Sequence, residues 1–220
     1  YTLHETSMRI HSVNQVAAPT QSSSLPPRPN ALGQVAAILH ARKVYRREDL
    51  AQVSNAVDRH LRELVSGGAL KRLAQGLYYA PKKSAFGVLP PDDQELVTAF
   101  LRDKDFLVFS RSSYNALGLG TSQLYNKTLV YNRKRHGLFS FGNREFDFRV
   151  KPRFPKKLSP EFLLVDAVNH LDELAEDQNR VLEMVARKLP GFDQAKLKRA
   201  VADFGSVATQ KRFMRWLAEF

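Results

Sequence analysis

A helix-like segment followed at once by a short hairpin places the strongest constraint on this chain. Residues 54–81 read SNAVDRHLRELVSGGALKRLAQGLYYAP, and apolar side chains recur at helical spacing through the first half of this run. Gly67 is expected to end the helix, and Gly76 to supply the positive φ of a tight turn between strands at 70–74 and 77–80. The run therefore predicts a helix with a two-stranded antiparallel hairpin packed behind it.

A helix at residues 31–43 and a short helical segment at 48–53 are expected before this one, and Ser54 is a good N-cap for the third helix. At about 100° per residue, the third helix has one apolar face that packs inward and one polar face that points outward. The inward face holds Ala56, Val57, His60, Leu61 and Leu64, and the outward face holds Asn55, Asp58, Arg59 and Arg62.

The outward face carries side chains that can read bases in the major groove of DNA. Arginine can bind guanine through two hydrogen bonds, and asparagine can bind adenine in the same way. A solvated helix face is the commoner explanation of such a stripe, but the basic hairpin behind it favours a winged helix-turn-helix bound to duplex DNA. We therefore expect Asn55, Asp58, Arg59 and Arg62 to read bases, and Lys71, Arg72 and Gln75 of the hairpin to contact phosphates.

The net charge of +12 points to a polyanionic partner because it is concentrated in two regions. Residues 31–83 hold 10 Lys and Arg against 4 Asp and Glu, and residues 127–157 hold 10 against 2. The second region alternates apolar and polar residues, which predicts a meander of strands with one apolar face. So many cations with few acids nearby favour a second nucleic-acid contact, with an acidic protein partner as the next explanation. The cations of this second basic patch are Lys127, Arg133, Lys134, Arg135, Arg144, Arg149, Lys151 and Arg153.

The rest of the chain completes an α+β protein with two domains. Residues 1–30 end in a Ser- and Pro-rich stretch that reads as a flexible arm or linker. Residues 31–83 are expected to form the winged helix-turn-helix domain, and residues 88–220 a C-terminal domain. That domain combines a small, mostly antiparallel basic sheet at about 127–153 with helices at about 160–220. Trp216 is most economically a core residue, and the alternative is a dimer patch formed by Trp216 and Phe220.

Two motifs carry a resemblance to a known family. The run VDRHLRELVSGGALKRLAQGLYYAP, followed after a helix by SSYNALGLGTSQ and a basic strand pair, resembles the AbiEi-type antitoxins of the abortive-infection, type IV toxin–antitoxin class. The resemblance covers about residues 31–160. It implies a winged helix followed by a C-terminal antitoxin domain, which represses its own promoter through inverted repeats in double-stranded DNA. It also implies a functional partner, a nucleotidyltransferase toxin encoded in the same operon.

No catalytic or metal-binding pattern competes with this interpretation. The chain has no cysteine, its six histidines show no metal-ligand spacing, and GLGTS lacks the Gly-Lys-Ser/Thr ending of a phosphate-binding loop. We expect no enzyme activity, no cofactor and no membrane contact, and a cytoplasmic location. Two other functions stay open: an antitoxin that clamps an acidic toxin directly, and an RNA-binding factor, because LFSF and FDF place aromatics near arginines.

Overall fold

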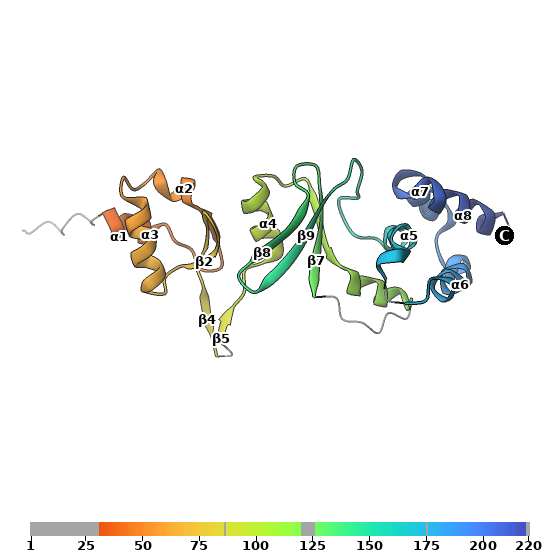
Figure 1. Cartoon of the computed structure of the whole chain (residues 1–220), viewed down its shortest axis with the longest axis horizontal. Coiled ribbons are helices and arrows are strands. Elements are labelled where there is room, and N and C mark those ends of the chain that lie inside the picture. The colour runs from red at the N-terminus through yellow and green to blue at the C-terminus, as the bar shows by residue number, and fades with distance from the viewer. Residues whose placement is uncertain (1–30, 86, 120–125, 175, 219–220) are drawn as a thin grey trace, which may run out of the picture.

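The computed structural model describes residues 31–85, 87–119, 126–174 and 176–218 of the 220-residue chain. The fold is α+β, and its elements lie in three groups along the long axis of the molecule (Figure 1). Three helices and a small sheet lie at one end, a second sheet with one helix lies in the middle, and a bundle of helices lies at the other end. Residues 1–30, expected as an arm or linker, lie outside the described residues.

The N-terminal group contains three helices and the expected hairpin, although the first helix ends at Ala37 rather than at residue 43. Val57, His60, Leu61 and Leu64 are the buried residues of the third helix, so the predicted inward face is confirmed apart from Ala56, which is half-buried. The strands form an antiparallel sheet in the order β1-β3-β2. The group consists of α1 (Ala31–Ala37), β1 (Val44–Arg46), α2 (Arg47–Ala51), α3 (Val57–Ser66), β2 (Lys71–Ala74) and β3 (Leu77–Tyr79).

The start of α3 differs from the prediction. The N-cap is Ala56, and the helix begins at Val57 rather than directly after Ser54. Ser54 is buried, and its hydroxyl lies 2.7 Å from Nδ1 of His60 and accepts a hydrogen bond from the Ala56 amide. The serine therefore joins the turn before α3 to the buried face of the helix, a tertiary role that local capping preference does not reveal.

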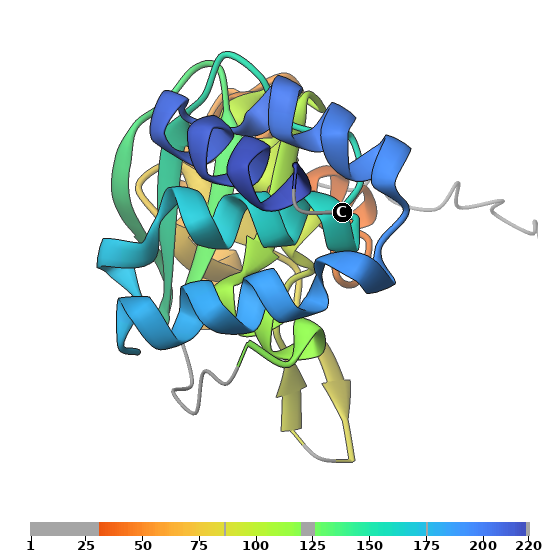
Figure 2. The same cartoon turned by 90° about the vertical axis from the view of Figure 1, so that its right-hand side faces the viewer.

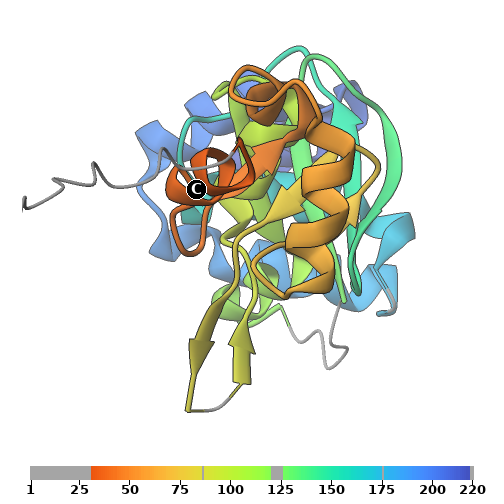
Figure 3. The ribbon, with the colours of Figure 1, turned by 90° about the vertical axis from the view of Figure 1, so that its left-hand side faces the viewer.

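A second hairpin, β4 (Lys82–Ser84) with β5 (Gly87–Leu89), follows the first without a helix between them. It projects from the body of the molecule as an isolated two-stranded ribbon (Figures 2 and 3). The sequence pattern did not predict this hairpin, because its strands are only three residues long and show no apolar alternation.

The middle sheet is mixed, and the predicted meander is wrong. The strand order is β6-β7-β9-β8, so β9 pairs in parallel with β7 and separates it from β8. The expectation of one apolar face is also wrong, because Leu129 and Tyr131 on one face of β7 and Val130 on the other are all buried. The group consists of α4 (Asp93–Leu101), β6 (Phe106–Ser110), the short 3-10 helix η1 (Arg111–Leu117), β7 (Lys127–Asn132), β8 (Gly137–Phe141) and β9 (Arg144–Val150).

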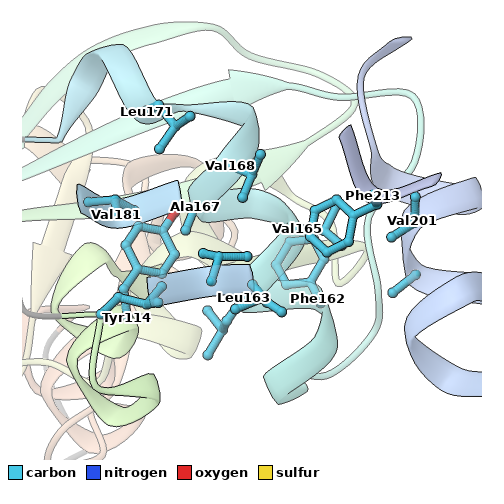
Figure 4. Close-up of a cluster of buried hydrophobic side chains, with 14 of the residues drawn as sticks. Tyr114, Phe162, Leu163, Val165, Ala167, Val168, Leu171, Val181, Val201 and Phe213 are labelled. Atoms are coloured by element: carbon cyan, nitrogen blue, oxygen red, sulfur yellow. The ribbon is translucent and has the colours of Figure 1, made fainter. Parts of the chain in front are cut away.

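The C-terminal helices bury one face of the middle sheet. In the largest buried cluster, α5 lies between Tyr114 of η1 on one side and Val201 and Phe213 of α7 and α8 on the other (Figure 4). Trp216 is partly buried and packs against Phe213, whereas Phe220 lies outside the described residues. The elements are α5 (Pro160–Asn169), η2 (Leu171–Glu173), α6 (Gln178–Lys188), η3 (Leu189–Gly191), α7 (Gln194–Phe204) and α8 (Val207–Leu217).

A second buried cluster crosses from the N-terminal sheet into the middle sheet. Val44, Leu77 and Tyr79 of β1 and β3 share it with Leu96 and Val97 of α4 and with the phenylalanines of β8 and β9. The backbone joins the two parts as well, because the Gly142 amide donates to the carbonyl of Leu73 on β2 over 2.9 Å. The boundary expected between residues 83 and 88 is therefore crossed by a common core.

We predict that Gly76→Val destabilises the protein through its backbone alone. Gly76 has a φ of +70°, and a Cβ built there meets no atom within 4 Å. An L-residue in this conformation costs roughly 1–2 kcal/mol, and a β-branched residue more. Urea unfolding followed by circular dichroism should show a decrease in stability of about 2 kcal/mol. Gly191→Val is the control, because Gly191 also has open space but no positive φ. Equal decreases at both sites would contradict the proposed role of the turn.

Candidate nucleic-acid interface

The predicted base-reading residues share one exposed face at the start of α3. Asn55, Arg59 and Arg62 are exposed, and Arg62 donates to the Asp58 carbonyl over 3.3 Å. Arg59 lies 3.7 Å from Glu63 on the next turn, an exposed pair that contributes little to stability. These three side chains are held only by weak contacts and can turn toward a ligand.

Asp58 differs from its three neighbours because it is bound by an arginine on α2. Nε and Nη2 of Arg47 donate to the two oxygens of Asp58 over 2.7 and 2.6 Å. This hydrogen-bonded pair lowers the pKa of Asp58 and raises that of Arg47, so both stay charged at neutral pH. The carboxylate therefore positions Arg47 beside α3, so this surface includes an arginine that the sequence did not single out.

Arg47 also links α2 to the turn of the first hairpin. Its backbone amide donates to the carbonyl of Gly76 over 2.9 Å. The three hairpin residues expected to contact phosphate, Lys71, Arg72 and Gln75, are all exposed. Arg47 therefore connects the first turn of α2 to both the outward face of α3 and the turn of the first hairpin.

A second arginine, Arg46, joins this surface to the middle of the molecule. Its Nη1 donates to the carbonyls of Ala99 and Phe100, over 3.0 and 3.2 Å, at the C-terminal end of α4. Those carbonyls lack partners within their own helix, and a cation is favoured there by the helix dipole. Glu48 of α2 completes the junction, because it accepts from Arg46 over 3.0 Å and from Arg102 over 2.7 Å.

The second basic patch is divided by the structure into exposed and partly buried cations. Arg144 forms a salt bridge with Asp93, and Arg149 pairs with both Asp147 and Glu173. The assumption that few acids lie near these cations is wrong, because most of the partners come from outside residues 127–157. The exposed members are Lys127, Arg133, Lys134, Arg135 and Arg153, and the half-buried members are Arg144, Arg149 and Lys151.

Three exposed cations of this patch lie in the loop between β7 and β8, next to the end of α4. Lys134 Nζ donates to the carbonyl of Arg102 over 3.3 Å and pairs with Asp103 over 2.8 Å. Arg133 lies 3.5 Å from Asp105, and the Arg135 guanidinium lies 5.1 Å from the centre of the Phe100 ring. Because Arg102 binds Glu48 of α2, this loop adjoins the surface formed by α2 and α3. We call residues 133–135 the basic loop.

Arg149 belongs to a partly buried ion-pair network instead. It donates to Glu173 over 2.7 and 2.6 Å and to Asp147 over 2.9 and 2.7 Å, and Arg111 also bonds Glu173. The Arg149 hydrogen bonds lower the pKa of Glu173 to about 2. Arg149 is therefore occupied in holding β9 to η2, and a phosphate has no access to it without breaking these contacts.

The comparisons with known proteins identify a family. A sequence profile for DUF6088, a family of unknown function, matches residues 45–183. The chain belongs to the DUF6088 family. The match begins within β1 and ends within α6, so it includes α3, both hairpins, the middle sheet and the basic loop. The comparison with curated proteins found no match.

One solved structure shares the fold of this DUF6088 protein over most of its length. The crystal structure of the RV2827C protein from Mycobacterium tuberculosis aligns with 85% of this chain and 74% of its own, with a TM-score of 0.52 and 17% sequence identity. At this identity the likeness concerns the fold alone.

Two further features are absent from the part of the chain that the structure describes. None of its helices combines the length and apolar character needed to cross a bilayer. Nor do the described residues contain a group of three His, Cys, Asp or Glu side chains placed to hold a metal ion.

We predict that Arg149→Met lowers the free energy of unfolding by about 3 kcal/mol at pH 7, because it leaves Asp147 and Glu173 without their shared cation. The pKa of Glu173 is depressed from 4.5 to about 2, so the pair stabilises the fold fully above pH 4.5 and less as the pH falls toward 2. The difference between variant and wild type should therefore shrink between pH 4.5 and 2 in urea titrations. Arg153→Met, at an exposed arginine, is the control. A difference independent of pH would contradict the role of the ion pair.

Proposed function

We propose that the N-terminal group is a winged helix that reads duplex DNA, and that the protein is a transcriptional autorepressor of the AbiEi antitoxin type. The observation that carries this proposal is the position of Arg47, whose side chain binds Asp58 on α3 and whose amide binds the Gly76 carbonyl in the hairpin turn. In a winged helix, the recognition helix enters the major groove and the hairpin meets the flanking backbone. This mode of binding requires the recognition helix and the hairpin to be adjacent.

The charges on this surface suit a polyanion. Arg59 and Arg62 are exposed on α3, and Lys71 and Arg72 are exposed on β2. Among the described residues, the salt bridges of this region involve Arg46, Arg47, Arg59 and Arg102, and none includes Arg62, Lys71 or Arg72. Positive charge that forms no salt bridge with an acid gains most from releasing the counterions of DNA.

The basic loop extends the same surface, and we propose that it contacts the duplex beyond the site read by α3. Its place beside Arg102 and Glu48 puts it next to α2 rather than on a separate part of the molecule. Contact at both places would favour bent DNA, at a cost of order 1–6 kcal/mol that the added phosphate contacts offset.

In the cell, the antitoxin would act by repressing the promoter of its own operon, which would carry inverted repeats and also encode a nucleotidyltransferase toxin. This part of the proposal rests on the sequence resemblance to AbiEi-type antitoxins. A reading frame for such an enzyme beside this gene would support it. The protein itself is proposed to be a DNA-binding regulator without catalytic activity, cofactor or membrane contact, located in the cytoplasm.

We predict that Arg59→Ala and Arg62→Ala each weaken binding to the upstream region of the gene by roughly 1–3 kcal/mol if they bind guanine through two hydrogen bonds. Asn55→Ala should behave similarly if Asn55 reads adenine. Fluorescence anisotropy with the cognate duplex and a scrambled duplex of equal length measures the effect, which should be smaller on the scrambled DNA. Arg180→Ala, at an exposed arginine on α6, is the matched control. Equal effects on both duplexes would mean that these arginines contact only phosphate.

A second prediction concerns the basic loop. Changing Arg133, Lys134 and Arg135 together to Ala should reduce the slope of log affinity against log salt by up to about 2.7, or roughly 0.9 for each phosphate that the variant no longer neutralises. The control removes three exposed cations from α7 and α8 at the far end of the molecule, namely Lys198, Lys211 and Arg212 (Figure 1). A slope equal to wild type would confine DNA binding to the N-terminal group and leave the basic loop to a protein partner.

A further inference from the structure

The β4–β5 hairpin projects from the body beside the first hairpin, and its exposure is not explained by folding. Figures 2 and 3 show it extending past the other elements as a free ribbon. Val88 and Leu89 are 43% and 36% exposed, and the three buried clusters of the described residues contain no residue of this hairpin. Isolated two-stranded hairpins are marginally stable in water. A ligand that binds along such a ribbon would therefore stabilise it.

The base of the hairpin is nevertheless fixed in direction. The Tyr79 hydroxyl donates to the Leu89 carbonyl over 2.7 Å, and Tyr79 is itself fully buried in the core shared by the two sheets. Pro90 and Pro91 then restrict the backbone where the chain enters α4. The ribbon is therefore held by its base on the same core that supports β2 and β3.

The second hairpin carries positive charges and no negative ones. The run PKKSAFGVLPP, residues 81–91, contains Lys82 and Lys83 and no acid. Lys82 is exposed, and among the described residues no salt bridge is formed by Lys82, Lys71 or Arg72. A second copy of this chain would bring like charges together at this surface, which disfavours self-association through the hairpin.

A groove joins the second hairpin to the first. It has a volume of about 500 Å³ and lies between β2, β5 and the turn that connects β8 to β9. Lys71 and Arg72 line one wall, Leu89 lines another, and Asn143 and Arg144 line the third. Lys82 lies directly opposite Leu89 in the strand register, so its side chain is on the same face of the ribbon as Leu89. Lys71 and Arg72 of the first hairpin therefore line the groove, and Lys82 of the second lies on the ribbon face that carries Leu89, one of its apolar lining residues.

We propose that the β4–β5 hairpin is a second wing that holds the sugar–phosphate backbone of the duplex read by α3, with phosphates bound between Lys71, Arg72 and Lys82. This inference rests on the proposed DNA-binding function. Lysine and arginine side chains bind the backbone irrespective of base sequence, and exposed apolar side chains such as Leu89 can pack against the sugars. The second wing therefore adds affinity and fixes orientation, while α3 supplies sequence specificity.

The test is a salt titration of the full chain carrying Lys82→Ala. On the cognate duplex, the slope of log affinity against log salt should fall by roughly 0.9, for the one phosphate contact that is lost, and it should fall equally on a scrambled duplex. Lys211→Ala removes the same charge from α8, at the opposite end of the molecule, and should leave the slope unchanged (Figure 1). A second variant, Lys82→Glu, should reduce the slope further than Lys82→Ala because it adds repulsion.

A parallel titration with Lys71→Ala and Arg72→Ala separates this inference from the function on which it rests. If wild type shows no salt-dependent binding to either duplex, the DNA-binding function is wrong. The second wing alone is wrong if wild type binds and the Lys71 and Arg72 variant has a reduced slope, but the Lys82→Ala variant keeps the wild-type slope. Weaker binding to single-stranded RNA with unchanged duplex binding would also overturn the second wing, and would assign the hairpin to RNA.

Discussion

The guanidinium of Arg46 fixes the N-terminal group against the middle of the molecule. It donates to two carbonyls at the C-terminal end of α4 and to Glu48, which also binds Arg102. Arg102 follows α4 in the left-handed region, with a φ of 51°, a conformation that costs a non-glycine residue roughly 1 kcal/mol or more. The contact with Glu48 helps to offset this cost. Because these bonds lie beside a shared apolar core, α2 and the middle sheet are joined by both polar and apolar contacts.

A buried carboxylate likewise joins the middle sheet to the C-terminal helices. Asp166 of α5 is 2% exposed and accepts hydrogen bonds from the hydroxyls of Tyr114, over 2.6 Å, and Tyr131, over 2.9 Å. Burial raises the pKa of both tyrosines, so they remain protonated donors. Removing either donor would leave a buried carboxylate undersatisfied, which is costly in a low-dielectric interior. The network fixes η1 and β7 against α5, and so positions the sheet that carries the basic loop.

Local patterns in the sequence predicted the elements near α3 well and the middle sheet poorly. Helical spacing identified Val57, Leu61 and Leu64 as buried, and Gly76 marked a turn of positive φ, because both signals depend on neighbouring residues. The parallel pairing of β7 with β9 carries no such signal, since strand order is decided by burial on both faces of the sheet. Arg47 was missed for a related reason: its partners, Asp58 and Gly76, meet it only in the folded chain.

Whether a cation of the second basic patch is able to bind a phosphate depends on how strongly its acidic partners hold it. Lys134 and Arg133 pair with Asp103 and Asp105 in exposed salt bridges, which are worth at most about 1 kcal/mol each. If the protein binds DNA as proposed, a phosphate can therefore replace each carboxylate at little cost, although the displaced acids then lie near the DNA and reduce the gain. Arg149 cannot make this exchange, because two acids hold it in a partly buried site and its release would leave Asp147 without its cation and Glu173 with Arg111 alone. Formal charge counts these cations equally, but only those whose partners are weakly held can contribute to binding.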